Sequence, residues 1–182
     1  SYRSDSTREE TKALAETPYL FGEIRQPDSD YIIIPRHTLE KRKYTPFAII
    51  SKDIICGDSN DFIPNASHYI LGVLQSNVHL LWVKYYCGRL ETRSRYSIEL
   101  LYNTFPFPDV TDKQREMISS TAKRILEVRE KYPFETLKAL YDTDLMKPDL
   151  LAAHKANDKA VMDAYGFNSS MSEEEILVAL YK

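Results

Sequence analysis

The first third of the chain alternates short apolar runs with turn-forming residues, a pattern that predicts β-strands. A short polar helix is expected first, over residues 6–16, and Pro18 limits it because the residue before a proline avoids helical backbone angles. Aromatic and β-branched runs bounded by proline, aspartate and serine then indicate strands. The expected strands cover residues 19–24, 30–36, 46–51 and 53–57.

Apolar positions change to helical spacing at Asn65. Residues 65–75 carry apolar side chains three and four positions apart, which predicts a helix. A second helix follows, with Ser76 as its N-cap and Gly88 as its stop. This helix is apolar nearly all round, so we expect it to be buried. Residues 88–108 then indicate a strand, a turn and a second strand.

Three helices are predicted after Pro108 from the residues at their ends. The first and the last begin with capping boxes, and the middle one has a proline in its first turn and a glycine at its end. These residues are Thr111 with Gln114, Pro148 with Gly166, and Ser172 with Glu175. The whole pattern predicts an α+β fold: short irregular β-strands around two buried helices, followed by a mostly helical C-terminal part. We place the two parts at residues 18–108 and 109–182.

Composition narrows the class of protein. Of the 182 residues, 43% are hydrophobic and 28% charged, as in globular proteins. No apolar run approaches the ~20 residues of a membrane helix, and no signal peptide opens the chain. Two cysteines, Cys56 and Cys87, fit a reducing compartment, and both are expected as buried small hydrophobes. We therefore expect a cytoplasmic protein, and the start at Ser1 suggests a piece of a longer chain.

The positive charge is concentrated in the middle of the chain. Residues 31–105 carry nine Lys or Arg against six Asp or Glu, a net charge of +3, whereas the chain as a whole has −3. Two stretches supply it, 35–44 and 84–96, and tyrosines lie among their charges. The basic residues are Arg36, Lys41, Arg42, Lys43, Lys84, Arg89, Arg93 and Arg95, and the tyrosines are Tyr44, Tyr85, Tyr86 and Tyr96.

Two interpretations of this basic pair of stretches remain open. It could be a solvated charged edge that discourages sheet aggregation. It could instead contact nucleic acid, because arginine and lysine bind phosphates and arginine also binds guanine O6 and N7. If the second stretch is extended, Glu91, Arg93 and Arg95 share one face. A carboxylate on cytosine N4 and a guanidinium on guanine could then read one C·G pair.

No catalytic constellation is expected in the chain. The four histidines have no metal-ligand spacing, and there is no Gly-rich phosphate loop. His79 lies on the apolar helix, where a hydrogen-bonded core histidine is the simpler interpretation. The acidic run at 173–175 is explained by its position at a helix N-terminus. We expect no metal and no cofactor in this chain.

The order of several motifs resembles the C-terminal region of large adenine-specific DNA methyltransferases. These are the type IIG/IIL restriction–modification enzymes and related single-chain modification enzymes. The resemblance covers nearly the whole chain. It rests on "LFGEIRQPDSDYIIIPR", "EKRKYTPFAII", "IPNAS", "HLLWVKYYCGRLETRSRYS", "LLYNTFPFP" and "AAHKANDKAVMDAYGF".

The resemblance implies a DNA reader separated from its catalytic domain. Residues 1–17 would be a linker helix from the methyltransferase domain, 18–108 the target recognition domain and 109–182 a helical C-terminal domain. S-adenosylmethionine and the "NPPY"-type motif that holds the flipped adenine would belong to the upstream domain. The parent would be a site-specific N6-adenine methyltransferase, with or without endonuclease activity, and the fragment itself non-catalytic. Its partners would be double-stranded DNA and the upstream domain, and no membrane.

The resemblance also implies residue roles. The base-reading residues would be Asp58, Ser59, Glu91, Arg93 and Arg95. The phosphate-binding residues would be Arg36, Lys41, Arg42, Lys43 and Arg89. Two other functions stay open: a module that docks a partner subunit through its acidic helices after residue 109, and a non-specific single-strand binder that stacks bases on its tyrosines.

Overall fold

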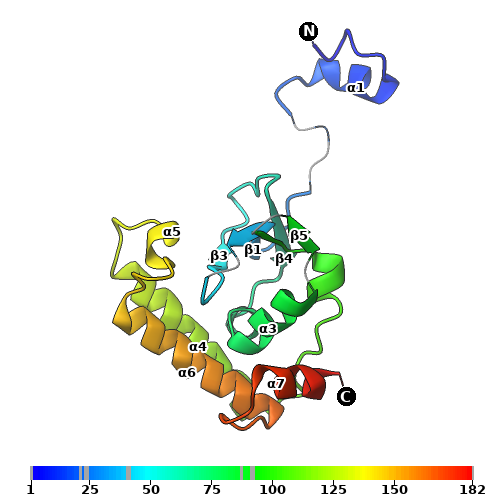
Figure 1. The fold of residues 1–182 in the computed structure, drawn as a ribbon. Coiled ribbons are helices and arrows are strands. Elements are labelled where there is room, and N and C mark those ends of the chain that lie inside the picture. Colours follow the sequence, from blue (N-terminus) through cyan, green and yellow to red (C-terminus); the bar gives the residue numbers. More distant parts are fainter. Residues whose placement is uncertain are drawn as a thin grey trace.

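The computed structural model describes residues 2–20, 22, 25–39, 42–86, 88–90 and 93–181, and these form an α+β fold (Figure 1). The expected fold class is confirmed. The first part contains α1 (Glu9–Ala13), η1 (Leu14–Glu16), β1 (Tyr31–Pro35), β2 (His37–Leu39), β3 (Ala48–Ile50), β4 (Asn60–Pro64), α2 (His68–Leu74), α3 (Asn77–Tyr86), β5 (Gly88–Leu90), β6 (Arg93–Arg95) and the π-helical turn η2 (Ile98–Tyr102). The second part contains α4 (Asp112–Glu130), α5 (Leu137–Leu140), α6 (Pro148–Tyr165) and α7 (Glu173–Leu180).

Two small antiparallel sheets form the strand-containing part. The first has the order β3-β1-β4 and the second β2-β6-β5. β1 is the central strand of the first sheet, and Ile32 and Ile34 are completely buried there. In the second sheet β6 is central, pairing His37 with Arg95 on one side and Gly88 with Arg95 on the other. β1 and β2 are separated only by Arg36, so the two sheets meet at that residue.

Two of the predicted strands are wrong. The described residues of 19–24 form turns and bends, and residues 53–57 form an irregular connection between β3 and β4. The isoleucines that suggested a strand, Ile54 and Ile55, are 58% and 63% exposed. The Gln26 side-chain amide donates to the carbonyls of Lys52 and Ile54, so these carbonyls are satisfied without a neighbouring strand.

The ends of α4, α6 and α7 agree with their sequence signals, whereas α1 begins at Glu9 and α2 at His68, three residues later than expected. Both capping boxes form, and α6 ends at Gly166 with a φ of 71°, a left-handed conformation that glycine adopts without a Cβ penalty. Ser76 caps α3 by accepting from the amide of His79. The short helix α5 escaped prediction because its four residues are too few for a periodic pattern.

The helical part packs against α2 through a close crossing. α4 and α6 lie side by side along most of their length (Figure 1), and α2 packs against α4. Gly72 makes this approach possible, since a Cβ there would lie 2.7 Å from the Ile118 side chain. The Asn157 side chain donates to the Gly72 carbonyl at 2.8 Å and thereby satisfies a buried acceptor between the two parts.

A buried polar network joins the same two parts further along. Arg129 of α4 donates to the Phe47 carbonyl, to Gln75 and to the Tyr141 hydroxyl. Its acceptors are neutral, and its guanidinium also lies over the Tyr141 ring. Such a network requires both parts to be in place, so it fixes their relative position. No helix in the described part of the chain is both long and apolar enough to span a bilayer.

Candidate nucleic-acid interface

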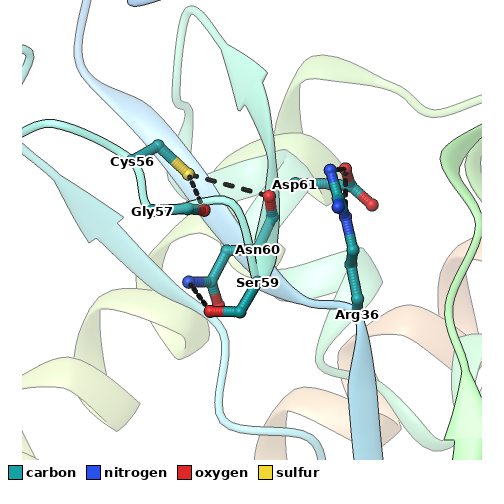
Figure 2. Close-up of polar contacts among 6 residues, drawn as sticks. All are labelled: Arg36, Cys56, Gly57, Ser59, Asn60 and Asp61. Atoms are coloured by element: carbon teal, nitrogen blue, oxygen red, sulfur yellow. Dashed lines mark hydrogen bonds and ion pairs between the residues drawn. The ribbon is translucent and has the colours of Figure 1, made fainter. Parts of the chain in front are cut away.

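The loop before β4 presents two of the expected base-reading residues to solvent. Asp58 and Ser59 occupy a turn closed by a hydrogen bond from the Asn60 amide to the Gly57 carbonyl at 3.0 Å, and both are exposed. Figure 2 shows the Asn60 side chain donating to the Ser59 hydroxyl oxygen at 3.2 Å. The turn is therefore tied by its own side chains while its tip stays free to contact a partner.

Cys56 precedes this turn and is half-buried, contrary to the expected full burial. Its thiol lies 3.7 Å from the Gly57 carbonyl oxygen and 4.0 Å from that of Asn60, so it contributes to the loop's shape (Figure 2). The polar carbonyls around it explain why it is not part of the apolar core. Cys87 lies outside the described residues.

Arg36 is held by an ion pair that the sequence did not reveal. Its Nε donates to Asp61 Oδ1 at 3.0 Å, and its Nη2 lies 2.9 Å from the same oxygen (Figure 2). The hydrogen bond to Asp61 raises the pKa of Arg36 further above its usual range. The arginine side chain remains 42% exposed, which leaves the rest of its guanidinium open to a partner.

One short segment brings the two expected base-reading regions together. Pro35 pairs with Asn60 in the first sheet, and the Arg36 amide donates to the Ser59 carbonyl at 3.3 Å. On the other side the Tyr96 amide donates to the Arg36 carbonyl at 2.8 Å, and His37 pairs with Arg95. Residues 35–37 thus connect the 58–59 turn to β6, two regions more than thirty positions apart in sequence.

Three of the arginines expected to contact DNA lie in the hairpin formed by β5 and β6. Arg89 pairs with Ser94, and Arg93 pairs with Leu90 in β5 and with Leu39 in β2. Two strands expected within 88–108 are present, at Gly88–Leu90 and Arg93–Arg95, whereas Ile98–Tyr102 form η2. Glu91, expected on the same strand face as Arg93, lies outside the described residues.

The first basic stretch continues after Arg36 toward Tyr44, and all of it except residues 40 and 41 lies within the described part of the chain. Arg42 is half-buried and Lys43 is exposed, while Lys41 lies outside the described residues. Tyr44, which follows them, is buried and its hydroxyl donates to Asp158 of α6 at 2.6 Å. Burial, and then the Asp158 charge, raises the pKa of Tyr44 well above its usual range. Tyr44 is therefore a core residue.

The other tyrosines near the basic stretches divide between core and surface. Tyr96 is buried and its hydroxyl lies 3.1 Å from His79 Nε2, while His79 Nδ1 lies 2.9 Å from the Leu74 carbonyl. This confirms His79 as a hydrogen-bonded core histidine, and its burial lowers its pKa to about 4. Tyr85 is 67% exposed. Because Tyr44 and Tyr96 lie inside the core, they do not form a row of exposed rings on which single-stranded bases could stack.

A cavity lies beside the exposed turn. Its lining includes the Arg36–Asp61 pair, Asp58, Asn60, Phe62 and Tyr19. Sequence reasoning missed Asn60 and Asp61 as parts of the site. No local sequence signal identifies these two residues, because they are placed by the antiparallel pairing of β4 with β1 and by the ion pair of Asp61 with Arg36. Among the described residues no group of three metal-binding side chains is found.

Fold and site together define a recognition module: an exposed polar turn and a basic hairpin held on two small sheets by a helical scaffold. Comparison with known protein families agrees with this class. Residues 1–109 match the family described as the MmeI target recognition domain, and residues 110–182 match the MmeI C-terminal domain. The chain belongs to the MmeI family, which confirms the resemblance stated from its motifs.

Individual relatives support the same assignment. A Bacillus subtilis (strain 168) protein named DNA methyltransferase A is 36% identical over the whole chain. A solved structure, of the type IIL restriction–modification enzyme MmeI in complex with DNA, is 39% identical and superposes with a TM-score of 0.89 over 99% of the chain. The chain spans only 21% and 24% of the lengths of these two relatives.

Proposed function

We propose that this chain is the sequence-specific double-stranded DNA recognition module of an N6-adenine DNA methyltransferase of the restriction–modification type. The observation that carries the proposal is the bridge at residues 35–37, which places the 58–59 turn beside β6. Two polar segments on one surface can contact neighbouring base pairs in a single major groove. The DNA complex of the MmeI relative and the methyltransferase name of the B. subtilis relative support this function.

In this proposal Asp58, Ser59, Glu91, Arg93 and Arg95 contact base edges. Arg42, Lys43, Lys41 and Arg89 contact phosphates, which contribute affinity without sequence preference. Arg36 was expected among the phosphate contacts. Its position between the turn and β6 favours a base edge instead, with Asp61 holding the guanidinium in one orientation.

The catalytic step belongs, in this proposal, to a methyltransferase domain upstream in the same polypeptide, where S-adenosylmethionine binds. The protein would act in the cytoplasm, where its DNA substrate is found. The helical part 109–182 supports the reading surface through the Asn157 and Arg129 contacts. A docking role for its acidic helices is the alternative that the experiment below separates.

The decisive experiment exchanges the two opposite charges of the hairpin in the full-length enzyme. Each good base contact is worth roughly 1–3 kcal/mol of discrimination. The coordinated change Glu91→Lys with Arg93→Asp should therefore move the preferred base at one position of the target, as read from the methylated adenines of DNA grown with the variant. Either change alone should cost more activity than the pair, because one charge would face the wrong edge.

Surface substitutions of the helical part provide the matched control. The coordinated change Glu173→Lys with Lys138→Glu also exchanges one acidic and one basic exposed residue, far from the hairpin in sequence, and should leave the target unchanged. If the hairpin variant methylates the original sequence unaltered, Glu91 and Arg93 do not read bases. Lost activity in the control alone would favour the partner-docking function.

A further inference from the structure

Tyr44 ties the basic stretch to the helical part of the molecule. Its hydroxyl donates to Asp158 Oδ2 at 2.6 Å, and its ring stacks on His154 with centroids 4.1 Å apart and planes 21° apart. Both partners lie on α6. The other oxygen of Asp158 accepts from the amide of Asn77, the first residue of α3, at 2.7 Å. One half-buried carboxylate therefore holds both the basic stretch and a core helix.

In this anchor the Tyr44 hydroxyl and both oxygens of Asp158 have hydrogen-bond partners, and Asp158 is half-buried. Burial raises the pKa of the Asp158 carboxyl, while the Tyr44 and Asn77 hydrogen bonds oppose that rise. Three residues further on, the Phe47 carbonyl accepts from both Gln75 and Arg129. The chain after the basic residues is thus fixed at two successive points.

Anchoring Tyr44 restricts the residues just before it. Consecutive Cα atoms are about 3.8 Å apart. The Cα atom of Lys43 is therefore one such step from the anchored Tyr44, and that of Arg42 is two steps away. Lys43 is exposed and Arg42 half-buried, so both can present charge to solvent from this anchored start. Fixing the backbone of one mobile residue costs roughly 1–2 kcal/mol of conformational entropy. If the residue is fixed only when DNA binds, this cost raises the dissociation constant by a factor of about five to thirty.

We propose that Tyr44 is a positioning residue for DNA binding: α6, through Asp158 and His154, holds Arg42 and Lys43 in place for the phosphates. The inference rests on the proposed function of the basic stretch and deepens it. It gives the C-terminal helical part a role in DNA affinity although Tyr44, Asp158 and His154 themselves contact no DNA. Since phosphates carry no sequence information, the effect should be equal on all duplexes.

The test uses Tyr44→Phe in the full-length enzyme, which removes the hydroxyl and keeps the stacked ring. Tyr165→Phe is the matched control, because the Tyr165 hydroxyl donates to the Pro106 carbonyl at 2.8 Å, away from the basic stretch. The dissociation constant is measured on target and non-target duplexes over a range of salt concentrations. Tyr44→Phe should weaken binding about fivefold on both duplexes, and Tyr165→Phe should leave it unchanged.

A double-mutant cycle separates positioning from a general loss of structure. In the background Arg42→Ala with Lys43→Ala, the change Tyr44→Phe should have no further effect on binding, because the residues it positions are gone. The same fivefold loss in that background, or no loss in the natural one, would overturn the inference. If the double alanine variant itself keeps full affinity and salt dependence, the phosphate role of the basic stretch fails first, and the inference with it.

Discussion

Gly72 should be among the positions least tolerant of an added methyl group. A Cβ placed there lies 2.7 Å from the Ile118 Cγ2 atom, 3.0 Å from Asn157 Oδ1 and 3.1 Å from the Ala122 Cβ. Carbon atoms normally pack about 3.5–4.0 Å apart, so Gly72→Ala requires a shift of roughly 1 Å between α2 and α4. None of the neighbours yields easily, since Ile118, Ala122 and Asn157 are all completely buried.

The size of the effect follows from three contributions. Overpacking a filled core costs about 1–3 kcal/mol. Weakening the hydrogen bond from Asn157 to the Gly72 carbonyl adds about 1 kcal/mol, while alanine in place of glycine within a helix recovers about 1 kcal/mol. We therefore expect Gly72→Ala to lower the free energy of unfolding by about 1–3 kcal/mol.

Urea unfolding of the 182-residue chain, followed by circular dichroism, measures this loss. Gly57→Ala is the matched control, because a Cβ at Gly57 meets only the Asn60 side chain, at 4.0 Å. The control should change stability by less than about 0.5 kcal/mol. Adding Ile118→Ala should make the Gly72→Ala change less costly, because the closest contact is removed. A Gly72→Ala variant as stable as the natural chain, or more so, would mean that α2 and α4 do not approach so closely.

Three further outcomes are expected. Lys43→Ala should weaken DNA binding equally on all duplexes and lower the slope of log affinity against log salt concentration by about one. Arg36→Ala should weaken binding to the target duplex more than to non-target duplexes. The reverse pattern would exchange the roles of the two residues. Burial lowers the pKa of His79 to about 4 and of His154 to about 3. Below pH ~6.5 both histidines take up protons in the unfolded chain but stay neutral in the folded one. Stability should therefore fall as pH falls from 6.5 toward 4, by about 2 kcal/mol per histidine at pH 5, and urea midpoints that do not move between pH 7 and pH 5 would contradict this. Calorimetric titration of the chain with S-adenosylmethionine should show no binding, and saturable one-to-one heat would place a cofactor site within it.

Local sequence was sufficient for the three longer helices after residue 109 and for strands β1, β3, β5 and β6. Helix ends depend on residues within one turn, so the capping boxes at Thr111 and Ser172 and the glycine stop at Gly166 could be recognised directly. The buried apolar strand β1 was equally clear from its run of isoleucines. The ordered motifs from "IIIPR" to "NTFPFP" also identified the family, because together they are more specific than any single pattern.

Tertiary structure alone decided how these pieces form a site. The apolar run 53–57 has strand composition, yet Gln26 binds its neighbouring carbonyls and the isoleucines face solvent. Arg36 and Asp61 lie 25 positions apart and meet only because β1 pairs with β4. Tyr44 was listed with the tyrosines among the basic residues, but it packs in the core, where α6 supplies Asp158 and His154. Such contacts depend on long-range pairing and packing, which no window of neighbouring residues contains.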